Sequence, residues 1–63
     1  EEFIVTRDTE LRPTGWLKVS RLDGRIAIAE VLRGLPGPRD EVVLPSTDLT
    51  RAAQALPPHP PGS

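Results

Sequence analysis

Apolar and polar residues alternate along two neighbouring segments in the middle of the chain. Residues 15–22 and 25–32 are rich in aliphatic and β-branched side chains, and the pair Asp23-Gly24 separates them. Such alternation is typical of half-buried strands, and Asp-Gly favours a two-residue type I′ turn, because both central positions of that turn need a positive φ. The pattern therefore predicts a β-hairpin that turns at Asp23-Gly24.

Pairing the two strands across this turn places Leu22 opposite Arg25 and Trp16 opposite Val31. Side chains alternate between the faces of a strand, so this register divides the hairpin into two faces. The predicted core face carries Leu17, Val19, Ile26 and Ile28. The second face carries Trp16, Lys18, Ser20, Leu22, Ala27, Ala29 and Val31. Because the second face is also largely apolar, we expect a curled barrel in which a loop, a helix or a partner covers part of it.

Shorter apolar runs lie on both sides of the hairpin. Residues 2–6 predict a first strand, and residues 41–44 predict a later strand that ends before Pro45. The polar, proline-containing residues 7–14 and the glycine- and proline-rich residues 33–40 predict loops, since such stretches do not sustain a sheet ladder. The fold class is therefore mostly β: a small, SH3-like curled barrel of about four or five strands with one short C-terminal helix.

The C-terminal part predicts that helix and then a tail. Ser46 or Thr47 can cap a helix that ends at Leu56, because a side-chain oxygen there accepts an early amide hydrogen. Residues 57–63 are proline-rich and predict a disordered tail or linker, with a polyproline II ligand as the alternative. We expect a domain at residues 1–56 and the tail at residues 57–63. The helix has one apolar stripe, formed by Leu49, Ala52, Ala53 and Leu56.

Composition narrows the classes of function. The 63 residues include no cysteine and one histidine, so the sequence predicts neither a disulfide framework nor a metal or cofactor site. His59 lies between prolines in the predicted tail, and no nucleophile stands near a positioned base, so we expect no enzyme activity. No apolar run approaches the roughly 20 residues that span a bilayer, and no signal peptide is visible, so we expect no membrane insertion by this segment.

Two sets of residues are candidates for contacting a partner. Trp16 is either a structural residue that covers the mouth of the barrel or a contact residue, since tryptophan is enriched in interface hot spots. The candidate interface consists of Trp16, Lys18, Ala27, Ala29 and Val31. The candidate basic patch consists of Arg12, Lys18, Arg21 and Arg25. The formal net charge of −1 disfavours a dedicated nucleic-acid surface, which usually shows a basic excess.

The stretch from Leu11 to Val31 combines a glycine, alternating apolar residues, a tight turn and alternating Ala and Ile. It resembles small β-barrel domains of bacterial envelope and assembly proteins, such as the barrel segments that accompany LysM repeats and the C-terminal domain of a flagellar assembly protein. In those domains a Gly-Asp-x-Val sequence follows the hairpin, whereas here Arg39 replaces the glycine before Asp40. The resemblance implies a non-catalytic assembly role in a bacterial protein of the cytoplasm or cell envelope, and it assigns no functional residue.

These observations predict a non-catalytic protein-interaction or assembly module, with self-association as one form of it. A nucleic-acid-binding small β-barrel is the alternative, and its binding would weaken steeply with added salt. The chain begins at Glu1 rather than Met, so we expect it to be a domain of a larger protein or a processed product.

Overall fold

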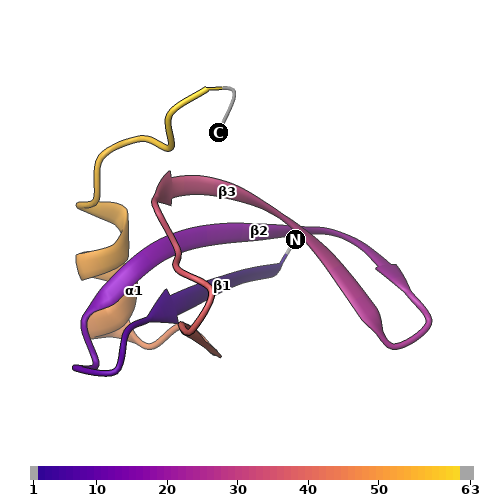
Figure 1. Cartoon of the computed structure of the whole chain (residues 1–63), viewed down its shortest axis with the longest axis horizontal. Coiled ribbons are helices and arrows are strands. Elements are labelled where there is room, and N and C mark those ends of the chain that lie inside the picture. The colour runs from indigo at the N-terminus through magenta and orange to yellow at the C-terminus, as the bar shows by residue number, and fades with distance from the viewer. Residues whose placement is uncertain (1, 62–63) are drawn as a thin grey trace.

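Four antiparallel strands form one open sheet in the order β3-β2-β1-β4, with a short helix against it (Figure 1). The computed structural model describes residues 2–61. The mostly β fold with one short C-terminal helix is therefore confirmed, and β3 and β4 are the edge strands of the sheet. The elements are β1 (Glu2–Arg7), β2 (Pro13–Asp23), β3 (Ile26–Gly34), β4 (Glu41–Val43) and α1 (Thr47–Gln54).

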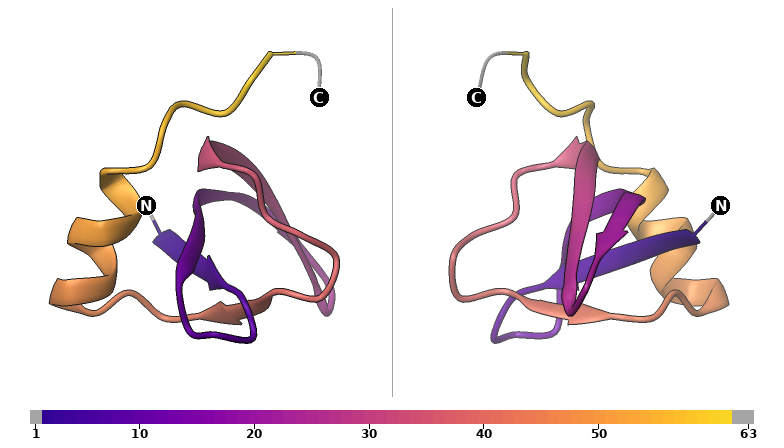
Figure 2. Two further views of the ribbon diagram at one scale, coloured as in Figure 1. Left: turned by 60° about the vertical axis from the view of Figure 1, so that its left-hand side comes forward. Right: turned by 90° about the vertical axis from the view of Figure 1, so that its right-hand side faces the viewer.

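Helix α1 begins after Ser46, which the structure selects from the two predicted caps. The Ser46 hydroxyl oxygen accepts a hydrogen bond from the Leu49 amide at 3.3 Å. The helix lies on one face of the sheet and packs mainly against β2 (Figure 2). Of the predicted apolar stripe, Ala53 is buried and Leu49 and Leu56 are half-buried, whereas Ala52 is exposed.

The buried core lies between α1 and the sheet. Val5 and Ala53 have no exposed surface, and Trp16 is 8% exposed. The rings of Phe3 and Trp16 stack with their centroids 5.0 Å apart and their planes 9° from parallel. Stacked rings contribute about 0.5–1.5 kcal/mol beyond the area they bury. Trp16 is therefore a buried core residue, while its predicted place at the mouth of a barrel stays a prediction. Partly buried apolar side chains complete the core: Phe3, Leu32, Val43 and Leu56.

The turn of the central hairpin lies one residue further along the chain than the sequence predicts. Asp23 pairs with Ile26, so the two turn residues are Gly24 and Arg25. Only Gly24 has a positive φ, of 62°. A positive φ at the first turn residue alone fits a type II′ turn, in which glycine takes the one position that strains other residues. The predicted type I′ turn at Asp23-Gly24 is wrong because Asp23 stays in the strand.

Two bulges then change which residues share a face. Ser20 in β2 and Leu32 in β3 have no directly opposed partner, since the register shifts at each of them. One extra residue on a strand exchanges the two faces beyond that point, because side chains alternate. Lys18 consequently lies opposite Glu30 rather than the predicted Ala29. Trp16 and Lys18 share the helix face with Phe3 and Val5, their partners on β1.

The predicted core face is wrong for the same reason. The face away from the helix carries Leu17 opposite Val31 and Val19 opposite Ala29, all half-buried. Ile26 and Ile28, predicted as core, lie on the helix side of β3 but beyond the reach of α1. They are 66% and 40% exposed.

The tail after α1, predicted as disordered, is tied to the sheet at its first residues. The Gly34 amide donates to the Pro57 carbonyl at 2.8 Å, and the His59 amide donates to the Leu32 carbonyl at 3.2 Å. Residues 57–60 are therefore not a free linker, and the predicted domain boundary after Leu56 cuts through these contacts. Residues 62–63 lie outside the described part of the chain.

Candidate interaction surface

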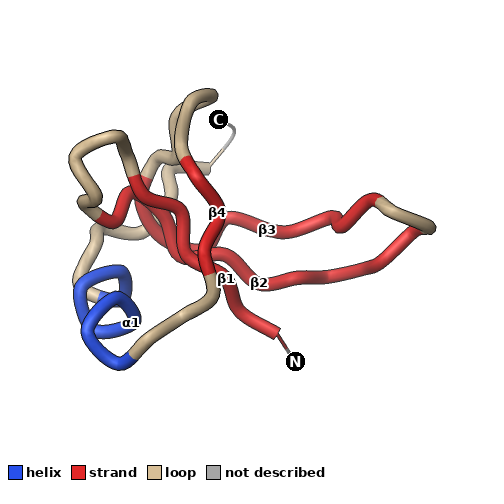
Figure 3. The backbone as a smooth tube through the Cα atoms, turned by 90° about the horizontal axis from the view of Figure 1, so that it is seen from below, coloured by secondary structure: helices blue, strands red, loops and turns tan. Residues whose placement is uncertain are grey.

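The end of the β2–β3 hairpin projects beyond the rest of the molecule (Figure 3). Every residue from Ser20 to Ile28 is exposed, and we call this segment the hairpin tip. It includes large apolar side chains: Leu22 is 71% exposed, Ile26 66% and Ile28 40%. Isolated apolar side chains are normal on a surface, but three on one projecting hairpin form a candidate contact surface.

The hairpin tip presents apolar side chains on both of its faces. Ile26 lies opposite Asp23, and Ile28 lies opposite Arg21, so these four side chains share one face. Leu22 lies opposite Ala27 on the other face. The bulge at the base of the tip is held by the Ser20 hydroxyl, which donates to the Ile28 carbonyl at 2.9 Å. The tip is thus a two-faced hairpin with a hydrogen-bonded base.

The structure divides the predicted interface between two sides of the sheet. Trp16 is buried under α1, and Lys18 is half-buried beside it on the helix face. Ala27, Ala29 and Val31 point to the opposite face, with Ala27 exposed and the other two half-buried. The sequence reasoning placed two exposed isoleucines in the core. Strand length could have identified these isoleucines as exposed. Strands of 11 and 9 residues are longer than a helix of 8 residues, so the end of the hairpin extends past the helix.

The predicted basic patch is not brought together. Arg12 lies in the loop before β2 and forms a 3.4 Å ion pair with Glu10. Arg21 and Arg25 lie at the other end of the hairpin, nine or more positions further along, which is roughly 30 Å of extended strand. Lys18, between them, lies opposite Glu30.

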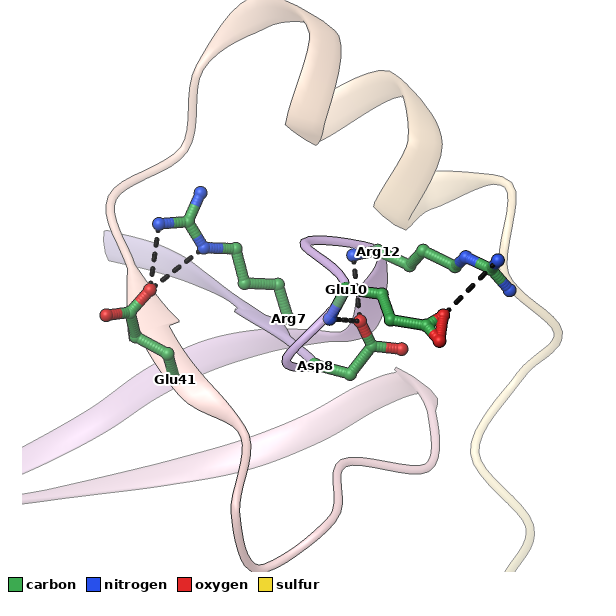
Figure 4. Close-up of polar contacts among 5 residues, drawn as sticks. All are labelled: Arg7, Asp8, Glu10, Arg12 and Glu41. Atoms are coloured by element: carbon green, nitrogen blue, oxygen red, sulfur yellow. Dashed lines mark hydrogen bonds and ion pairs between the residues drawn. The ribbon is translucent and has the colours of Figure 1, made fainter.

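Charged side chains at the opposite end of the sheet shape the loop between β1 and β2 (Figure 4). Arg7 on β1 contacts one carboxylate oxygen of Glu41 on β4 through Nε at 2.9 Å and Nη2 at 2.8 Å. Asp8 accepts hydrogen bonds from the Glu10 and Arg12 amides at 2.9 and 3.0 Å. Between them Leu11 has a φ of 66° and is 64% exposed. These contacts account for the loop structure.

The Asp40 carboxylate, bonded to Thr14 and to Gly37, anchors the loop after β3. Thr14 donates its hydroxyl hydrogen to Asp40 at 2.6 Å, so Thr6 is the donor in the 3.0 Å bond between the two threonine hydroxyls. The Gly37 amide also donates to Asp40, at 2.7 Å. The Thr14 hydroxyl and then the Gly37 amide hold the pKa of Asp40 below its ordinary value of 3.8. All of these groups bond one another, so the cluster is structural.

A hollow of about 390 Å³ lies between the tail and the ends of β2 and β3. Next to it, His59 Nδ1 lies 2.9 Å from the Gly34 carbonyl oxygen, so the ring of this tail residue is held to the sheet. Within residues 2–61, no three His, Asp or Glu side chains gather as ligands for a metal ion. The hollow is lined by Pro13, Thr14, Gly34, Leu35, Leu56, Pro57, Pro58 and Pro60.

Fold and surface together define a small antiparallel β domain with one covering helix and an exposed, apolar hairpin tip. No family model, curated protein sequence or solved structure matches this chain. No helix in the described part of the chain is long and apolar enough to cross a membrane.

Proposed function

We propose that this domain is a non-catalytic protein-interaction or assembly module and that the hairpin tip is its contact element. The observation that carries the proposal is the exposure of Leu22, Ile26 and Ile28 on a hairpin that projects past the core. Fully burying an aliphatic side chain of this size stabilises a complex by about 1.5–3 kcal/mol. A partner that covers the tip would therefore gain a substantial apolar contact from three residues.

The same observation supports protein rather than nucleic acid as the partner. Nucleic-acid surfaces combine clustered basic residues with aromatic side chains that stack on bases. Here the tip is aliphatic, and its basic residues Arg21 and Arg25 share it with Asp23. Trp16 and Phe3, the two aromatic residues of the chain, stack on each other within the core region.

The SH3-like form of the domain is part of this proposal. The support is that three register shifts, at Thr6/Arg7, Trp16/Leu17 and Val19/Arg21, interrupt a sheet of only four strands. Bulges increase the local twist and bend the strand, which favours a curled sheet. Closure into a barrel would need contact between the two edge strands, β3 and β4.

The proposal is tested by site-specific photo-crosslinking of this protein within its own cells. We expect a photoreactive residue at Leu22 to give a discrete crosslinked protein band, and the same residue at Gln54, exposed on α1, to give none. Adding the second substitution Ile26→Lys should abolish the band. Equal labelling at both positions, or a product at Leu22 containing nucleic acid instead of protein, would overturn the proposal.

A further inference from the structure

The outer edge of β3 already receives an extended segment at one end. Strand β3 lies at the edge of the sheet and has β2 as its neighbour on one side. On its other side, Arg33 forms an antiparallel bridge with Pro58, flanked by the two hydrogen bonds from Gly34 and to Leu32. The tail therefore shows that this edge accepts an antiparallel strand, and the tail ends that pairing at Leu32.

The remainder of the edge, Ile26–Val31, is built as an unprotected edge strand. Natural sheets guard their edges with lysine, proline, charges or bulges. These six residues contain Glu30 as their one charged residue and no proline, and the bulge on β3 itself lies beyond them at Leu32. The other free edge of the tip, on β2, carries both Arg21 and Asp23. Of the two edges, β3 is thus the one suited to pairing.

The backbone groups that would make such a pairing can be placed. The Ser20 hydroxyl bonds to the Ile28 carbonyl, so the backbone of Ile28 points toward β2. Because successive residues of a strand direct their amide and carbonyl groups to opposite sides, Ala27 and Ala29 direct theirs outward. Their small side chains let another backbone approach closely.

We propose that two copies of this chain associate by pairing β3 with β3 in antiparallel orientation about a two-fold axis at Ile28. This inference rests on the proposed function and names a second copy as the partner. Ile28 would face Ile28 of the second copy, and Ala27 would face Ala29 of the second copy. No two like charges would oppose each other, and both copies would use the same surface, as a two-fold interface requires.

The choice of a second copy comes from the length of the free edge. The turn at Gly24-Arg25 ends the edge on one side, and the docked tail ends it at Leu32 on the other. With the axis at Ile28, the turn of the second copy falls at Val31 and Leu32, where the tail begins. Moving the axis to Ala29 would place Ile26 of the second copy against the tail. The free edge of β3 is therefore just long enough to pair with β3 of a second copy.

The test is the solution mass of the whole chain over a concentration series, by sedimentation equilibrium. We expect the mass to rise from 6.9 kDa toward twice that value. Ile28→Lys, which opposes two ammonium groups at the axis, should raise the dissociation constant of the dimer about tenfold or more. Ala29→Pro, which removes an outward amide, should have a similar effect. The matched control is Leu44→Lys, which charges an exposed aliphatic residue outside the hairpin tip and should dimerise as the unmodified chain does.

Hydrogen exchange identifies the pairing edge directly. The Ala29 amide should exchange more slowly as concentration rises, and this change should disappear in Ile28→Lys. A chain that stays monomeric at every concentration would overturn the self-pairing, as would a dimer that Ile28→Lys leaves intact. Either result would leave the proposed function standing if the Leu22 crosslink to another protein is still observed. Failure of the β3–β3 pairing can therefore be distinguished from failure of the proposed function.

Discussion

Gly34 stands where three segments of the chain meet. Its φ of 78° lies in the region that L side chains rarely adopt, and an added Cβ would overlap the Thr14 carbonyl oxygen. The same residue bonds to the tail through both its amide and its carbonyl group. A side chain at this position would therefore disturb the end of β3 and the docking of the tail together.

Asp40 makes the stability of the fold depend on pH. A carboxyl group whose pKa is lowered in the folded state stabilises that state above its unfolded pKa, and this contribution is lost as the pH falls through the folded pKa. We expect Asp40→Asn to lower the urea midpoint of unfolding near neutral pH, with the difference from the unmodified chain shrinking below pH 3.8. Thr14→Val should reduce the same pH dependence, and Thr14→Ser should retain it. A difference that is constant across pH would contradict this assignment.

At the scale of elements, the helix shows how a local signal and a long-range contact combine. Ser46 caps α1, and Asp48 lies in its first turn, where a negative charge favours the helix dipole. An isolated helix of eight residues is not stable in water, so packing of Ala53 against the sheet completes it. Capping sets where the helix starts, and the sheet provides most of its stability.

The two candidate caps predict different effects of substitution. Ser46→Ala should lower the free energy of unfolding by about 0.5–1 kcal/mol, because it removes the acceptor of the Leu49 amide. Thr47→Ala should change it by less, since Thr47 is the first residue inside the helix. Urea denaturation of both variants measures the difference. An equal loss in the two would show that Ser46 is not the cap.

At the scale of the whole molecule, the tail joins the last part of the chain to the edge of the sheet. The Arg33 guanidinium donates to the Leu56 carbonyl at 3.1 Å, next to the backbone bonds that follow. These contacts cover the end of β3 and place the hollow between the tail and the sheet. The folded unit among the described residues therefore extends past the helix.

Removal of the tail should destabilise the fold. A chain truncated after Leu56 leaves the amide of the buried Gly34 without its partner, and leaving a buried donor unpaired costs about 1–3 kcal/mol. His59→Ala should cost less, because it removes the side-chain bond and keeps the backbone ones. Thermal unfolding of the three chains measures the order. If the truncated chain unfolds at the same temperature as the full chain, the tail is a linker after all.

The sequence by itself determined the elements of this protein. Alternation predicted both hairpin strands, Ser46 was one of two predicted caps, and short apolar runs located β1 and β4. These features depend on neighbouring residues, whose spacing and backbone preferences can be read directly. For Trp16 the sequence left two interpretations open, a structural residue and a contact residue, and the surface assigned with it was divided between two faces.

Only the tertiary structure decided which residues are exposed. The bulges at Ser20 and Leu32 depend on how β2 and β3 fit one another, and each bulge exchanges the faces for every residue beyond it. The exposure of Ile26 and Ile28 depends on where α1 ends relative to the hairpin, which no local pattern specifies. The pairing of the tail with β3 is likewise a contact between distant segments. For these physical reasons the candidate site had to be located from the fold.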